Sequence, residues 1–222
     1  MFIKICGITT PEDAAAVFKA GADCIGIVHY PKSPRHLTAA QMLPVLDAAE
    51  PFRKQGRKTV LVAADAAATE ITDILEKTGN RFDHVQVHRE LTDDEFSLLS
   101  NGLLRHNTGL NIIRVIRTLE TVQRLRQCSS PSSLTARLYL LELSHGQLPG
   151  GNGKSWDWSA AKPFCQKFPT LLAGGITPEN VADLLRQAEP FGIDLSSGVE
   201  LSPGRKDIEK VRKMITIVRS FS

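Results

Sequence analysis

Two short segments rich in glycine and serine, near the C-terminal end of the chain, have the composition of a phosphate-binding site. Ala173-Gly174-Gly175 and Ser196-Ser197-Gly198 each follow a short apolar run. Glycine lets backbone N–H groups approach a ligand closely, and serine hydroxyls can donate hydrogen bonds to phosphate oxygens. The same residues also form ordinary tight turns. Their occurrence after two successive strand-like runs favours a phosphate site made of Gly174, Gly175, Ser196, Ser197 and Gly198.

Such a site requires strands that end on the same side, and the chain contains eight short apolar or β-branched runs. These runs are too short, and too often bounded by Gly, Pro or Asp, to be helices. We therefore expect strands at Phe2–Cys6, Asp23–Val28, Thr59–Ala63, His84–His88, Asn111–Arg117, Leu138–Glu142, Thr170–Ala173 and Gly192–Leu195.

Amphipathic segments separate the expected strands, and several begin with a threonine that can cap a helix. Thr10, Thr38 and Thr177 are in this position, and Pro11 and Pro178 follow two of them. Proline is well tolerated at the first helical position, where its missing N–H has no partner to lose. A strand followed by a helix, eight times over, predicts a (β/α)8 TIM barrel, although an open doubly wound sheet gives a similar alternation.

An internal similarity favours the closed barrel over the open sheet. The segment from Gly7 to Ala15 resembles the segment from Gly175 to Ala182, and each leads into a helical segment and then an Asp-bearing strand. Related strand–helix units at both ends of a chain suit a closed ring, although two helix starts can also be alike by chance.

Length and composition indicate an ordinary globular chain. The 222 residues, with 42% hydrophobic and 23% charged residues, suit one barrel domain over residues 1–222. The 27 basic and 24 acidic residues are mixed along the chain and leave a net charge of +3, which does not suggest nucleic-acid binding.

Other classes of protein are also disfavoured. Cys6, Cys24, Cys128 and Cys165 show no paired spacing, and no His or Cys pattern has zinc spacing. No apolar run approaches the ~20 residues that cross a bilayer, and the N-terminus lacks a signal-peptide pattern. We expect a cytoplasmic protein without a metal, cofactor or membrane partner, present as a monomer or weak homodimer that binds a small phosphorylated substrate.

The ends of the expected strands carry an ordered set of motifs. They are Lys4-Ile5-Cys6-Gly7-Ile8-Thr9, Ser33-Pro34-Arg35, Gln86-Val87-His88, Gly150-Gly151-Asn152-Gly153-Lys154-Ser155-Trp156-Asp157-Trp158, Ala173-Gly174-Gly175-Ile176-Thr177-Pro178-Glu179-Asn180 and Asp194-Leu195-Ser196-Ser197-Gly198-Val199-Glu200. This set resembles phosphoribosylanthranilate isomerase of tryptophan biosynthesis, from the first strand to the last helix.

The resemblance implies an Amadori rearrangement without a cofactor, in which phosphoribosylanthranilate becomes the open-chain carboxyphenylamino-deoxyribulose phosphate. It implies that Cys6 is the general base, that Glu142 stands at the position of the general acid, and that Arg35 binds the anthranilate carboxylate. These residue types suit the chemistry. An acid protonates the ring oxygen, a base removes a proton from the adjacent sugar carbon, and a planar guanidinium pairs with a carboxylate through two hydrogen bonds. We expect His88 near the site without a role, and Trp156 and Trp158 packed over the barrel rim.

The sequence departs from the family pattern on one side of the expected site. Glu142 replaces the aspartate that follows Leu-Leu, Arg89 replaces the glycine that follows Gln-x-His, and the third strand ends towards Asp65 without the usual phenylalanine. Two further functions therefore stay open. One is an isomerase for another aminated pentose phosphate, and the other is a sugar-phosphate-binding barrel with weak catalysis.

Overall fold

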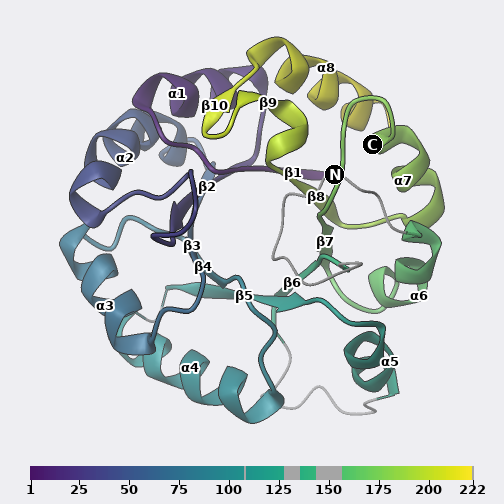
Figure 1. Ribbon diagram of the computed structural model, residues 1–222, viewed down its shortest axis with the longest axis horizontal. Coiled ribbons are helices and arrows are strands. Elements are labelled where there is room, and N and C mark those ends of the chain that lie inside the picture. The colour runs from purple at the N-terminus through teal and green to yellow at the C-terminus, as the bar shows by residue number, and fades with distance from the viewer. Residues whose placement is uncertain (108, 128–135, 144–156, 222) are drawn as a thin grey trace.

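Eight parallel strands pair in sequence order and close into a barrel, which Figure 1 shows from one end with helices around it. The structure is a computed structural model that describes residues 1–107, 109–127, 136–143 and 157–221. The strands are β1 Phe2–Cys6, β2 Cys24–His29, β3 Lys58–Ala63, β4 His84–Val87, β5 Asn111–Ile116, β6 Leu138–Leu141, β7 Thr170–Leu172 and β8 Gly192–Leu195. The barrel closes where Phe2 pairs with Gly192 and Ile5 with Leu195.

This architecture confirms the predicted TIM barrel and excludes the open sheet. The helices are α1 Pro11–Ala20, α2 Ala39–Arg53, α3 Ala68–Lys77, α4 Asp93–His106, α5 Leu119–Gln127, α6 Lys162–Cys165, α7 Val181–Ala188 and α8 Ile208–Arg219, with 3-10 turns η1 Trp158–Ala161 and η2 Ser197–Val199. None of the described helices combines the length and apolar character needed to span a membrane.

A small antiparallel hairpin lies outside the barrel sheet. Its strands are β9 Glu200–Ser202 and β10 Arg205–Lys206. In Figure 1 this hairpin lies close to β1, inside the part of the helix ring formed by α1 and α8. The hairpin is therefore placed to contact the C-terminal end of β1.

Four of the predicted strands end one residue later than the observed strands do. His88, Arg117, Glu142 and Ala173 each follow the last residue of their strand. Three of them still donate a backbone hydrogen bond to the neighbouring strand. His88 donates to Ala63, Glu142 to Ile116 and Ala173 to Leu141. The chain turns towards its loop at these positions, so polar side chains gather where the sheet ends.

The predicted caps hold for two helices and fail for the third. The Thr10 and Thr38 hydroxyls cap α1 and α2. Thr177 is not the cap of α7, which begins only at Val181, after Asn180. The Asn180 side chain accepts a hydrogen bond from the Thr177 backbone N–H and closes a turn there. The prediction was wrong because the Thr-Pro-Glu-Asn segment forms this separate turn before the helix.

Alternation along the strands separates two packed layers. Residues such as Ile3, Ile5 and Ile193 belong to the core between the sheet and the helices, whereas Val60 and Val62 belong to a second cluster inside the barrel. Because successive side chains of a strand point to opposite faces, alternation decides which polar residues face the barrel interior. These inward residues are Lys4, Cys6, Gln86, Glu142 and Asp194, each next to an outward apolar residue.

Candidate active site

The predicted site residues lie around one cavity of about 690 Å³ at the C-terminal ends of the strands. The structure brings together all eight of them around this cavity: Cys6, Arg35, Glu142, Gly174, Gly175, Ser196, Ser197 and Gly198. Catalytic sites of TIM barrels are found at this end, because the loops that follow the strands converge there.

The segments at residues 173–175 and 196–198, called here the glycine-serine segments, have a backbone that requires glycine. Gly174 and Gly175 have φ angles of 93° and 66°, in the left-handed region that side chains disfavour. At Gly198 a Cβ atom would lie 1.9 Å from the carbonyl oxygen of Ile176, so the two segments pack backbone against backbone. This close packing leaves a small-residue surface, open to the cavity, next to the Ser196 and Ser197 side chains.

Cys6 ends β1 and lines the cavity with a partly buried side chain. Its Sγ packs against Gly26 of β2, where a Cβ atom would come within 2.9 Å. Burial raises the pKa of the Cys6 thiol, although the ammonium groups of Lys4 and Lys206 partly oppose this shift. In the free protein Cys6 is therefore mainly a thiol at neutral pH.

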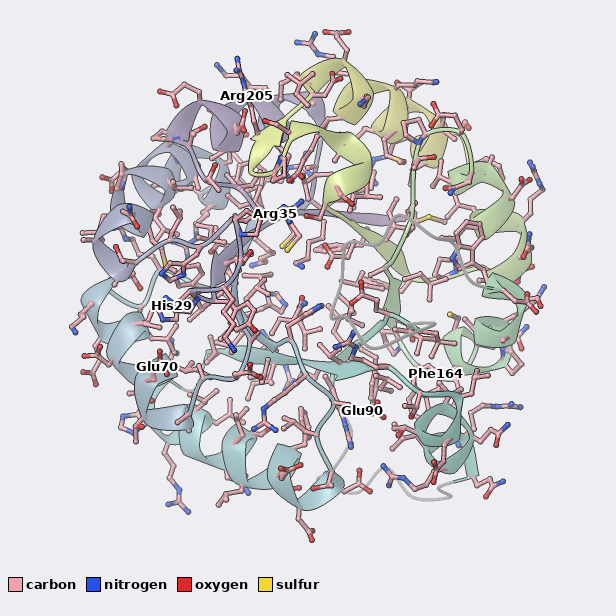
Figure 2. The ribbon with its side chains drawn as sticks, in the orientation of Figure 1. His29, Arg35, Glu70, Glu90, Phe164 and Arg205 are labelled. Carbon is pink, nitrogen blue, oxygen red and sulfur yellow. The ribbon has the colours of Figure 1, made fainter. Side chains whose placement is uncertain are left out.

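Arg35 is held by a buried acid from the β9–β10 hairpin, a contact that the sequence did not suggest. Its Nε and Nη2 donate to Glu200 at 2.8 and 2.5 Å. Lys206, whose side chain is fully buried, donates to the same carboxylate at 2.6 Å and to the Cys6 carbonyl oxygen at 2.6 Å. Figure 2 shows Arg35 directed towards the centre of the barrel. Arg205, which belongs to the β9–β10 hairpin, lies at the outer edge of the barrel in this view. The hairpin thus connects the guanidinium to the end of β1.

Glu142 lies across the cavity from this cluster and is almost fully buried. Its Oε2 is 3.1 Å from Nε2 of His88, which stands at the end of β4. Burial alone would raise the pKa of the Glu142 carboxyl, but His88, Arg117 and Lys4 together outweigh it and lower this pKa. Glu142 is therefore ionised in the free protein.

A second buried carboxyl group, Asp194 of β8, also faces the cavity. Its Oδ2 accepts from Lys4 Nζ at 2.7 Å, and its Oδ1 has no hydrogen-bond partner among the described residues. Burial raises the pKa of Asp194 despite the neighbouring Lys4. The pKa of Lys4 is raised as well, because the neighbouring Asp194 carboxylate outweighs the effect of burial on the ammonium.

Four buried charged residues of this site had no predicted role: Lys4, Asp194, Glu200 and Lys206. The sequence carried a signal for two of them, because a Lys or Asp in the middle of an apolar strand rarely becomes buried without a partner. Glu200 and Lys206 had no such signal, since they lie in a hairpin that the strand pattern did not predict.

The residues that depart from the family pattern lie at the same mouth. Arg89 lines the cavity and faces Glu95 at 3.6 Å, with 39% of its side chain exposed. Asp65 also lines the cavity and has a φ of 58°. Trp158 is buried, whereas Trp156, like Cys128, lies outside the described residues. Within the described ranges, no three His, Cys, Asp or Glu side chains gather in a group that could hold a metal ion.

Comparison with known proteins identifies the family. The sequence pattern of the family described as N-(5'phosphoribosyl)anthranilate (PRA) isomerase matches residues 3–217. The chain belongs to the PRA isomerase family. A curated relative from Acaryochloris marina, named N-(5'-phosphoribosyl)anthranilate isomerase, is 35% identical over 100% of this chain and 99% of its own. A relative of the same name from Pseudomonas fluorescens is 38% identical over 97% of both chains.

Solved structures agree with this family assignment. The PRA isomerase of Thermotoga maritima has a TM-score of 0.80 and 27% identity, with 99% of both chains covered. A PRA isomerase in complex with reduced 1-(o-carboxyphenylamino)-1-deoxyribulose 5-phosphate has a TM-score of 0.77 and 26% identity over 99% of both chains. A further similar structure contains monomers made from the dimeric Thermotoga maritima enzyme. PRA isomerases are enzymes of the aldose–ketose isomerase type, and they act in tryptophan biosynthesis.

Proposed function

We propose that this protein isomerises N-(5'-phosphoribosyl)anthranilate to 1-(o-carboxyphenylamino)-1-deoxyribulose 5-phosphate, with Glu142 as the general acid and Cys6 as the general base. The observation that carries this proposal is that both side chains border one cavity with the glycine-serine segments. Membership of the PRA isomerase family supports the substrate.

The glycine-serine segments would bind the phosphate of this substrate. Gly174, Gly175 and Gly198 leave the backbone accessible, and Ser196 and Ser197 add hydroxyl donors. Binding through backbone N–H groups fixes the sugar without placing a mobile cation beside it. The phosphate therefore anchors one end of the substrate, and the ribose extends over the cavity floor.

Arg35 would bind the anthranilate carboxylate. Glu200 holds Nε and Nη2 of this guanidinium, so the edge that carries Nη1 stays available for the ligand. A guanidinium fixed by a carboxylate on one edge is already oriented, and less rotamer freedom is lost when the substrate binds. This contact would distinguish an aryl carboxylate from an uncharged ring.

The first step opens the ribose ring. Glu142 transfers a proton to the ring oxygen, the bond between that oxygen and the anomeric carbon breaks, and the nitrogen lone pair forms a C=N bond. The product is a positively charged Schiff base, and Glu142 is left as a carboxylate. Glu142 must be protonated beforehand. The negative charges of the bound phosphate and carboxylate favour this protonation, because like charges raise the pKa of a carboxyl group.

The second step moves a proton from carbon. The Cys6 thiolate removes the proton from the sugar carbon next to the Schiff base, and the electrons of that C–H bond form a C=C bond that neutralises the nitrogen. The resulting enol becomes a ketone when the Cys6 thiol gives its proton to the former anomeric carbon and the enol O–H loses its proton to the Glu142 carboxylate, which restores the acid. The Cys6 thiol must first release its proton to solvent, and the positive charge of the Schiff base favours this release because it lowers the pKa of the nearby thiol. The reaction is an isomerisation without external oxidant or reductant, and we propose that it needs no cofactor.

Arg89 favours a second candidate within the same reaction class, an isomerase for another aminated pentose phosphate. Its cation lines the mouth where the family pattern has glycine, and it would suit a substrate with an additional anionic group. The third candidate, a barrel that only binds sugar phosphates, does not explain why both Cys6 and a buried carboxyl group border the cavity.

Growth in the absence of tryptophan tests the proposed substrate. The gene for this chain is expressed in cells that lack their own isomerase, with the Cys6→Ser variant as a matched control. We expect the wild-type chain to restore growth and the variant to fail. Restored growth by the variant would remove Cys6 as the base. Failure of a well-expressed wild-type chain would favour the second candidate substrate.

A further inference from the structure

A row of polar side chains crosses the barrel interior from β1 to β6. The buried ammonium of Lys4 donates to Oε1 of Gln86 at 2.9 Å. Nε2 of Gln86 lies 3.0 Å from Nδ1 of His88, and Nε2 of His88 lies 3.1 Å from Oε2 of Glu142. The row therefore connects a fixed cation on one side of the barrel to the proposed acid on the other.

Each member of the row fixes the orientation of the next. An ammonium group only donates hydrogen bonds, so the Gln86 atom that faces Lys4 must be the amide oxygen. The amide NH2 group then faces His88 and donates to Nδ1. A ring nitrogen that accepts a hydrogen bond carries no proton, so the ring proton of His88 is placed on Nε2. That nitrogen is the one that faces Glu142.

Lys4 fixes the orientation of the Gln86 amide, and through it the tautomer of His88. Both Lys4 and Gln86 are fully buried, so water does not compete for their hydrogen bonds. Asp194 accepts a second hydrogen bond from Lys4 at 2.7 Å and favours its charged form. Reversing the Gln86 amide would place its NH2 group against the ammonium, so that the NH2 group has no acceptor there and Lys4 keeps only Asp194, which is costly in a buried site.

We propose that Gln86 and His88 are positioning residues for the acid, and that Gln86 sets the His88 tautomer so that its Nε2–H is presented to Oε2 of Glu142. This inference rests on the proposed role of Glu142. With Oε2 facing an N–H donor, a protonated Glu142 carries its proton on Oε1, the oxygen left for the substrate. After transfer, the carboxylate accepts a charge-assisted hydrogen bond from His88.

The contact between His88 and Glu142 is close but not aligned in the free barrel. Oε2 of Glu142 is buried and accepts no hydrogen bond of good geometry from the described residues. Catalytic hydrogen bonds often tighten only when substrate binds. The 3.1 Å separation of Nε2 and Oε2 already suits a hydrogen bond and only its angle has to improve, so the row is placed to stabilise the carboxylate that forms during proton transfer.

Nitrogen NMR of the histidine side chains tests the tautomer directly in the free protein. The chain has 6 histidines, and a His88→Gln variant assigns the resonances of His88 by difference. We expect an unprotonated Nδ1 and a protonated Nε2 in the wild-type protein. In Gln86→Glu, a carboxylate replaces the NH2 donor, so we expect Nδ1 to become protonated. A wild-type Nδ1–H tautomer, or an unchanged tautomer in Gln86→Glu, overturns the proposal.

Turnover measurements show whether the tautomer matters for the reaction. We expect Gln86→Glu to lower kcat about 10- to 150-fold, as for loss of a hydrogen bond to a charged group, while affinity for the reduced product analogue is unchanged. His88→Gln keeps an N–H donor and should retain more turnover than His88→Ala. Full kcat in Gln86→Glu with a changed tautomer overturns the positioning role. A wild-type protein with the expected tautomer but no isomerase turnover would instead contradict the proposed function.

Discussion

The buried carboxylate of Glu200 gives the sharpest stability prediction. It accepts from Arg35 and from Lys206, and only 4% of its side chain is exposed. Glu200→Gln keeps the shape and removes the charge, which leaves the buried Lys206 ammonium without its counter-charge. Removing one partner of a buried ion pair costs about 3–5 kcal/mol. Arg35 is 17% exposed and can turn to water. We therefore expect the lower end, about 3 kcal/mol.

Thermal unfolding followed by circular dichroism measures this loss. For a chain of this size about 3 kcal/mol lowers Tm by about 6–12 °C. The exposed pair of Glu179 with Lys213 is the matched control, and Glu179→Gln should leave Tm unchanged. The double variant Glu200→Gln, Lys206→Met should be more stable than Glu200→Gln alone, because it removes the uncompensated charge. Equal Tm values for wild type and Glu200→Gln would refute the reasoning.

The pH dependence of the Glu200 contribution has a defined sign. Burial raises the pKa of this carboxyl, but Arg35 and Lys206 outweigh burial and lower the pKa in the folded chain. A lowered folded pKa means that the contribution is complete above the unfolded value of about 4.3 and is lost as pH falls through the folded value. The difference in unfolding free energy between wild type and Glu200→Gln should therefore shrink as pH falls below about 4.3.

Three further predictions concern the cavity. Burial raises the pKa of the Cys6 thiol, so its alkylation by iodoacetamide, followed by mass spectrometry, should increase steadily from pH 7 to pH 9, and a plateau near pH 7 would contradict this. Gly198→Ala places a Cβ against the Ile176 carbonyl and should weaken binding of the reduced product analogue, as measured by calorimetry. The control is Gly102→Ala, whose Cβ meets no atom within 4 Å. This control should keep the affinity and raise helix stability by up to about 1 kcal/mol. Glu142→Asp should retain or increase kcat, and a complete loss would show that the longer side chain is required.

The sequence was sufficient to predict the barrel and the eight named site residues that line its cavity, whereas Lys4, Asp194, Glu200 and Lys206 of the same site had no predicted role. Alternation along the strands places Lys4, Cys6 and Asp194 inside the barrel, because their neighbours in sequence are apolar and face the helices. Glu142 and His88 follow the last residues of their strands, and the rule that loops converge at one end of a TIM barrel brings them together.

Contacts between distant segments could not be predicted from these patterns. Arg35 and Glu200 are 165 positions apart, and only the folded β9–β10 hairpin brings them together. Gln86 pairs with Lys4 because their two separate strands direct both side chains into the barrel at the same level along its axis. The failed prediction of Thr177 as a cap has a local cause, since the turn closed by Asn180 precedes the helix.

The isomerisation rate of freshly prepared phosphoribosylanthranilate, compared among wild type, Cys6→Ser and Glu142→Gln, tests the central claim most directly. We expect turnover by the wild-type protein and a loss of at least about 100-fold in each variant, as for removal of a general acid or base. Both variants should bind the reduced product analogue as the wild type does, which shows that the cavity is intact. A fully active Glu142→Gln variant, or a wild-type protein that binds the analogue without turnover, would contradict the account.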